Sequence, residues 1–163
     1  MNSLDAAVFA ARFGDVAEDA PWVSEAACAA RPFVDREAMV DAFALAVRSA
    51  ARSRQLALLR AHPDLAGRAA AVGDIAAESR REQAGAGLDR LTAGEFARFQ
   101  DLNARYRERF GFPFILAVKG ATKHAILAAF EARIGNDAET ERATALANVE
   151  RIVRFRIEAR VAP

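Results

Sequence analysis

His62 is one of two histidines in the chain, and it stands between a helical run over residues 55–61 and Pro63. A residue that precedes proline is pushed out of the helical region, so we expect the helix to end here. The imidazole would then lie on a stiff corner, which suits a general acid or base. The alternative is a histidine that interacts with the last carbonyl groups of the helix, and on the residues alone both interpretations stay open.

Ser79, Glu82 and Gln83 form a second polar group. On a helix their spacing places all three on one face. Ser79-x-x-Glu82 also matches a capping box, in which Ser79 is the N-cap and Glu82 reaches back to it, and this cap is the favoured interpretation. The two roles are compatible, because a helix N-terminus also presents free N–H groups to an anionic ligand.

Arg156 is the third candidate, because it lies on the apolar side of the last expected helix. Leu146, Val149, Ile152 and Val153 recur there at core-facing spacing, and Arg156 follows seven residues after Val149. An inward guanidinium is costly unless it is paired. We therefore expect Arg156 to meet a carboxylate or a ligand.

Other kinds of site have little support in the sequence. Two distant histidines and a single cysteine, Cys28, provide no pair of metal ligands at the usual spacings. Cys28 has no activating pattern and is interpreted as a small buried hydrophobe, and neither a nucleophile elbow nor a glycine-rich phosphate loop is present. Proton chemistry on a small molecule, without a cofactor, is what these absences leave.

The composition sets mild limits. The 163 residues are 53% hydrophobic and 28% charged, which is typical of a soluble globular domain. A net charge of +1 argues against nucleic-acid binding, which needs a concentrated basic face. No apolar stretch reaches membrane-spanning length and no secretory signal is visible, so we expect a cytoplasmic protein that does not bind membranes.

Abundant alanine and the near absence of strand-like alternation predict an all-α fold, a single compact multi-helix domain over residues 1–163. Residues 115–118 are either extended or one buried helical turn. Residues 64–72 are expected to form a short helix that ends at Gly73. The other helices are expected over residues 4–11, from Pro21 to the break at Arg31-Pro32-Phe33, after the cap Asp35, up to His62, over residues 78–86, and after the caps Thr92, Thr122 and Asp137.

Seven short motifs follow one another along nearly the whole chain. They are Pro21-Trp22, Arg31-Pro32-Phe33, His62-Pro63-Asp64-Leu65-Ala66-Gly67, Ser79-x-x-Glu82-Gln83-Ala84-Gly85-Ala86-Gly87-Leu88, Leu102-Asn103-x-x-Tyr106, Phe110-Gly111-Phe112-Pro113-Phe114-Ile115 and Phe155-Arg156-Ile157. Each motif alone is weak, but their common order and spacing are specific. In them the chain resembles the 2-oxo-4-hydroxy-4-carboxy-5-ureidoimidazoline (OHCU) decarboxylases, which complete the oxidative conversion of urate to allantoin.

The resemblance implies an all-α enzyme, typically a homodimer, that needs neither a metal nor an organic cofactor. The family's catalytic histidine falls on His62, its active-site glutamate on Glu82 and its substrate-binding arginine on Arg156. Further positions match residues that line the pocket or a segment whose backbone approaches the substrate: Pro63, Ser79 and Gln83, and Ile115, Leu116, Ala117, Val118 and Lys119.

The implied reaction is the decarboxylation of OHCU to (S)-allantoin. The carbanion left by the loss of CO2 is delocalised into a neighbouring imine of the substrate, which explains why no cofactor is needed. We expect His62 to act as the general acid or base, Glu82 to orient the imidazole or the substrate's N–H groups, and Arg156 to fork onto carbonyl oxygens. Gln83 would hydrogen-bond the ring or the ureido group.

Two rival functions stay open on the sequence. One is a cofactor-free lyase that acts on a different ureido or imidazoline acid. The other is a non-catalytic helical module that binds a partner through an apolar face.

Overall fold

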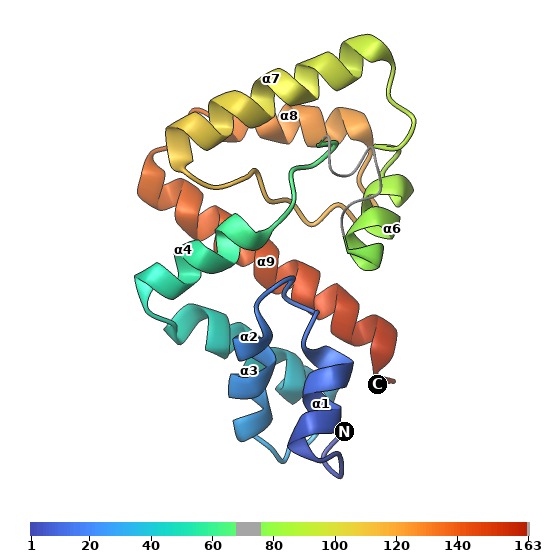
Figure 1. The fold of residues 1–163 in the computed structure, drawn as a ribbon, viewed down its shortest axis with the longest axis vertical. Coiled ribbons are helices and arrows are strands. Elements are labelled where there is room, and N and C mark those ends of the chain that lie inside the picture. Colours follow the sequence, from blue (N-terminus) through green and yellow to red (C-terminus); the bar gives the residue numbers. More distant parts are fainter. Residues whose placement is uncertain (68–75, 163) are drawn as a thin grey trace. The chain divides into compact units, whose positions relative to one another are not determined.

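The computed structural model describes residues 1–67 and 76–162, and within these ranges the secondary structure is helical with no β-strand (Figure 1). This confirms the predicted all-α class. The described helices are α1 (Ala6–Phe13), α2 (Pro21–Ala29), α3 (Arg36–Ser49), α4 (Arg52–Ala61), α6 (Ala77–Gly85), α7 (Ala93–Phe110), α8 (Lys123–Arg133) and α9 (Ala138–Arg160).

The chain divides into two compact units. Unit 1 consists of Met1–Ala61 and Leu146–Pro163, and unit 2 consists of His62–Ala145. Helix α9 contributes residues to both, because the boundary falls at Leu146. That both units belong to a single domain stays a prediction.

Unit 1 is built from α1 to α4 and the C-terminal part of α9. Helix α1 begins later than predicted, because the side chain of Asp5 accepts a hydrogen bond from the backbone N–H of Val8 and so caps the helix at Ala6. Pro21 and Asp35 begin α2 and α3 as predicted. The core contains phenylalanines that contact one another, with 4.9 Å between the ring centroids of Phe9 and Phe13.

Unit 2 contains α6, α7 and α8. The capping box at Thr92 is confirmed, since Thr92 and Glu95 each accept a hydrogen bond from the other's backbone N–H. Lys123 at the start of α8 donates to the same Glu95 carboxylate. This bond and the bond from the Thr92 N–H lower the pKa of Glu95 to about 2. The cap of one helix is thereby tied to the start of the next.

The end of α7 leads into a loop that crosses the core of unit 2. Gly111 ends the helix with a φ of 75°, a left-handed conformation that glycine adopts without a steric cost. Residues 113–118 are not helical, which leaves the extended alternative for 115–118. The ring of Phe114 stacks on Phe130 of α8 with 3.9 Å between centroids, and it meets Tyr106 edge-on. The loop is therefore packed firmly against both helices.

Two smaller predictions are wrong. The short helix expected over 64–72 does not begin at residue 64, because residues 64–67 are not helical, and residues 68–72 lie outside the described residues. Cys28 is half-buried, so its interpretation as a buried residue is wrong.

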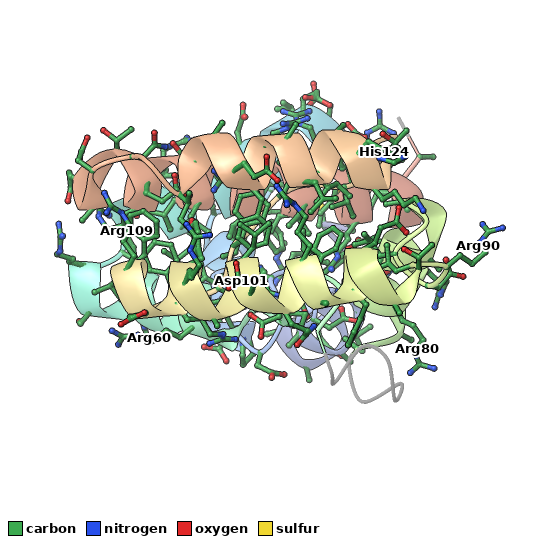
Figure 2. All side chains as sticks on the ribbon, turned by 90° about the horizontal axis from the view of Figure 1, so that it is seen from above. Arg60, Arg80, Arg90, Asp101, Arg109 and His124 are labelled. Atoms are coloured by element: carbon green, nitrogen blue, oxygen red, sulfur yellow. The ribbon has the colours of Figure 1, made fainter. Side chains whose placement is uncertain are left out.

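The other histidine of the chain, His124, is exposed on α8 (Figure 2). None of the described helices is both long and apolar enough to cross a membrane. In residues 1–67 and 76–162, no three His, Cys, Asp or Glu side chains gather as metal ligands.

Candidate functional site

His62 lies on the corner that the sequence predicts. Helix α4 ends at Ala61, immediately before His62, and His62 is 5% exposed. The chain then turns tightly, because the N–H of Gly67 donates to the carbonyl of Asp64 at 3.3 Å. Ala66 within this turn has a φ of 50°, in the left-handed region that residues with side chains rarely adopt. A buried, titratable ring thus precedes a strained turn.

Helix α6 carries Ser79, Glu82 and Gln83, but the predicted cap is wrong. The helix begins at Ala77 with Ala76 as its N-cap, so Ser79 is already the third helical residue. Ser79 is buried, and it cannot serve as the N-cap of a helix that has begun two residues before it. Gln83 is buried as well, and Glu82 is half-buried. The interpretation of these residues as a shared polar face is the one that stands.

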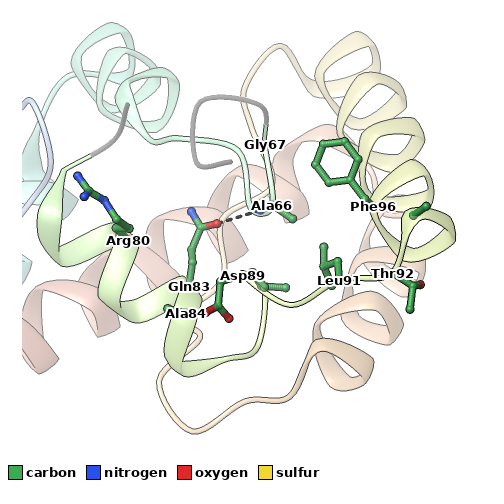
Figure 3. Close-up of a pocket in the computed structure, with 11 residues that line it drawn as sticks. Ala66, Gly67, Arg80, Gln83, Ala84, Asp89, Leu91, Thr92 and Phe96 are labelled. Atoms are coloured by element: carbon green, nitrogen blue, oxygen red, sulfur yellow. Dashed lines mark hydrogen bonds between the residues drawn. The ribbon is translucent and has the colours of Figure 1, made fainter. Parts of the chain in front are cut away.

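Gln83 connects α6 to the turn that follows Pro63. Its side-chain oxygen accepts a hydrogen bond from the backbone N–H of Ala66 at 2.9 Å, and its amide nitrogen donates to the carbonyl of Asp64 at 3.4 Å. Figure 3 shows the side chain pointing from the helix toward this turn. Gln83 therefore holds the backbone next to the catalytic candidate, a contact that the sequence did not reveal.

A cavity of about 430 Å³ lies beside this turn, a volume typical of small-molecule sites. Its described lining includes Gln83 and Arg80 of α6, Asp89 of the following loop, and Phe96 of α7 (Figure 3). Gln83 is the member of the predicted site among these lining residues. Gln83 therefore both lines the cavity and holds the turn that follows Pro63.

The segment from Ile115 to Lys119 is also largely buried in unit 2, although Lys119 at its end is exposed. Its first carbonyl, that of Ile115, accepts a hydrogen bond of 2.8 Å from Arg133. The guanidinium of Arg133 also lies over the ring of Phe114, at 4.4 Å from its centroid. Arg133 thus fixes the start of a segment that the family resemblance assigns to substrate binding.

Arg133 is held in turn by a fully buried carboxylate, that of Glu141. The two side chains form an ion pair of 2.5 Å, and Asn136 donates to the other carboxylate oxygen at 2.7 Å. The hydroxyl of Tyr106 donates to Glu141 as well. Burial, and then the Glu141 carboxylate, raise the pKa of Tyr106 far above its usual value, so the phenol stays protonated and remains a donor.

Arg156 belongs to unit 1, where it is 3% exposed. Of the two partners that the sequence predicts for it, a carboxylate or a ligand, the structure shows a carboxylate: an oxygen of Glu18 lies 2.7 Å from the guanidinium. The carbonyl oxygens of Asp15 and Val16 lie 3.5 Å from the same guanidinium. Glu18 itself has a φ of 55°, which is unusual for a residue with a side chain.

The sequence did not single out Glu18. A buried arginine predicts that some carboxylate is near, but 22 acidic residues were available and the loop that carries Glu18 has no distinguishing pattern. Of the predicted site residues, His62, Pro63, Ser79, Glu82, Gln83 and 115–119 lie in unit 2, and Arg156 lies in unit 1. The structure connects Gln83 to the turn after Pro63 by hydrogen bonds.

Comparison with known proteins identifies the family. The family model described as OHCU decarboxylase matches residues 2–158. An OHCU decarboxylase of Haloferax volcanii is 44% identical over 160 residues, which are 98% of this chain and 93% of the relative. The mouse protein of the same name is 40% identical over 157 residues, 96% of this chain and 88% of the relative.

A solved structure described as (S)-allantoin synthase has the same fold. It superposes with a TM-score of 0.75 at 32% identity, and the match covers 98% of this chain. The match covers 52% of that solved chain, so this chain spans about half its length. The family model covers nearly all of this chain and the relatives are matched over most of their length: the chain belongs to the OHCU decarboxylase family.

Proposed function

We propose that this chain decarboxylates OHCU to (S)-allantoin in urate degradation. Family membership over residues 2–158 and the names of its relatives support this assignment. The structural observation that carries it is His62, a buried titratable ring at a helix end, followed by a turn that Gln83 holds from α6. The proposal includes a cytoplasmic homodimer that needs neither a metal nor an organic cofactor.

The chemistry requires the enzyme to stabilise one displaced electron pair and to control proton transfers at an oxygen, a nitrogen and a carbon of the substrate. When the bond to the carboxylate breaks, CO2 leaves and the electron pair of that bond forms a double bond between the two ring carbons. The electron pair of the neighbouring carbon–nitrogen double bond moves to the ring nitrogen, which takes up a proton. The substrate hydroxyl then loses its proton and becomes the ring carbonyl, while a proton is added to the carbon that carries the ureido group. Because that carbon becomes the stereocentre, the enzyme must deliver the proton to one face.

His62 is the residue suited to this proton transfer, since a neutral imidazole can accept the hydroxyl proton and an imidazolium can donate one. Glu82 would orient the imidazole or bind the substrate's N–H groups. Arg156 would donate paired hydrogen bonds to the ureido and ring carbonyl oxygens and stabilise the negative charge that develops. Gln83 has a second amide N–H for the substrate besides the one it donates to Asp64.

The test is His62→Asn, which keeps the size of the side chain but removes the titratable group. The substrate is generated in place by uricase and the upstream hydrolase, and circular dichroism follows the handedness of the allantoin formed. We expect the wild-type protein to produce (S)-allantoin and the variant to lose about 10²–10⁴-fold in kcat. The matched control is His124→Asn, because His124 is exposed on α8, and it should retain the wild-type rate.

Two outcomes would overturn the proposal. Racemic allantoin with and without the wild-type protein would exclude the reaction and favour a different ureido acid as substrate. A wild-type rate in the His62→Asn variant would exclude proton transfer by this residue.

A further inference from the structure

The loop that follows Pro63, residues 64–66, is held by side chains of α7 as well as by Gln83. Asn103 donates its amide N–H to the carbonyl of Leu65 at 2.9 Å, and Gln100 donates to the carbonyl of Ala66 at 2.8 Å. The carbonyl oxygens of two successive residues, Leu65 and Ala66, therefore each accept a hydrogen bond from a side-chain amide of α7. Asparagine side chains often bond backbone groups near in sequence, in caps and turns, whereas these bonds join residues that are 34 and 38 positions apart.

The loop needs these bonds because its backbone is strained. Ala66 has a φ of 50°, a conformation that costs free energy for an alanine and persists when surrounding contacts impose it. Arg107, one turn of α7 beyond Asn103, adds an ion pair of 2.9 Å to the carboxylate of Asp64. Together, the contacts from α6 and α7 fix the backbone conformation of the loop.

Asn103 is the most informative of these residues, because it lies 5% exposed on the apolar face of α7. Its side-chain oxygen is buried and accepts no hydrogen bond from the residues that the structure describes. A buried oxygen of this kind is unfavourable, and a leucine would avoid it. The bond to the carbonyl of Leu65 is the contact that an asparagine makes here and a leucine cannot.

We propose that Asn103 is a positioning residue for His62. By binding the carbonyl of Leu65, Asn103 fixes the loop that begins directly after Pro63. Because the rigid Pro63 is the only residue between this loop and His62, fixing the loop also fixes the position of the imidazole. The inference rests on the proposed role of His62 and explains why the Leu102-Asn103-x-x-Tyr106 motif has a polar residue on a buried stripe. A small displacement of a catalytic group can lower a rate by about 100-fold, so such an anchor matters for catalysis.

The test is Asn103→Leu, which removes both the donor and the buried oxygen. We expect kcat to fall by about 10–100-fold with KM changed less than about threefold, because the groups that bind substrate are intact. The melting temperature should stay within about 5 °C of wild type. Asn2→Leu is the control, since Asn2 in unit 1 also donates to a distant backbone carbonyl, that of Phe33 at 2.8 Å, and its side-chain oxygen accepts from the N–H of Phe33. This control should keep the wild-type kcat.

A second variant keeps the proposal testable if Asn103→Leu does not fold. Gln100→Leu removes the donor to the next carbonyl from a half-buried position and should also lower kcat more than KM. Wild-type kcat in folded Asn103→Leu, or a loss matched by an equal loss of folded protein, would overturn the positioning role. Failure of the wild-type protein to form (S)-allantoin would instead overturn the proposed function.

Discussion

In the residues that the structure describes, each unit contains an arginine–glutamate ion pair whose carboxylate side chain is buried, and the two pairs are built differently. In unit 2, Glu141 is fully buried in the regular helix α9, and a tyrosine and an asparagine donate to it besides Arg133. In unit 1, Arg156 and Glu18 are 3% and 7% exposed, and Glu18 has a left-handed backbone conformation. The backbone of Glu141 is thus unstrained, whereas Glu18 is held in a strained backbone conformation.

This difference separates two uses of a buried charge. Arg133 donates to the carbonyl of Ile115, so the unit 2 pair fixes a backbone segment and the side chains themselves stay in the core. Arg156 is itself proposed to bind substrate, and strain that persists beside such a residue is typical of functional sites. We therefore expect the first pair to govern mainly stability and the second mainly activity.

The largest effect is expected from Glu141→Gln. The variant leaves Arg133 without a buried counter-charge and turns an amide N–H toward donors, so the free energy of unfolding should fall by about 3–5 kcal/mol. Urea denaturation followed by circular dichroism measures this loss. Glu131→Gln is the control, because its pair with Arg98 is largely exposed and should contribute less than about 1 kcal/mol. Equal losses in the two variants would remove the distinction between a buried network and a surface pair.

The Arg156→Lys variant addresses the other pair. Lysine keeps the charge opposite Glu18 but lacks the planar fork of donors, so we expect the free energy of unfolding to change by about 1 kcal/mol or less while kcat/KM falls at least about tenfold. Arg160→Lys on the same helix is the control, since Arg160 pairs with the exposed Asp15. A wild-type kcat/KM in Arg156→Lys would remove Arg156 from the substrate site.

The helix ends show how far local sequence predicts this fold. Thr92-x-x-Glu95 and Ser79-x-x-Glu82 have the same pattern, yet the first is a capping box and the second is not. Caps at Asp35, Thr92 and Asp137 were predictable because each side chain bonds a backbone N–H two or three residues later. The cap predicted at Ser79 is absent because the helix begins upstream of it, at Ala77. No residue of the Ser79-x-x-Glu82 motif indicates this earlier start.

The candidate site shows the opposite limit. The helix end before His62 and the buried, paired state of Arg156 could be predicted, because a proline and an apolar stripe mark these residues within their own segments. The contacts of Glu18 and Asn103 could not be predicted, because their partners lie 138 and 38 residues away in the chain. Gln83 illustrates both cases, since the family motif marked it but its bonds to the loop after Pro63 depend on the tertiary fold.

The smallest expected effect concerns the strain at Glu18. Both Glu18→Gln and Glu18→Gly remove the carboxylate that faces Arg156, but glycine adopts a φ of 55° without the clash that a Cβ atom makes. If the backbone is held in this conformation by its surroundings, Glu18→Gly should be more stable to urea than Glu18→Gln by about 1 kcal/mol. A glycine variant that is less stable than the glutamine variant would show that the left-handed conformation stores little strain. The comparison of the two pairs would then rest on what their arginines contact, because backbone strain would no longer distinguish Glu18 from Glu141.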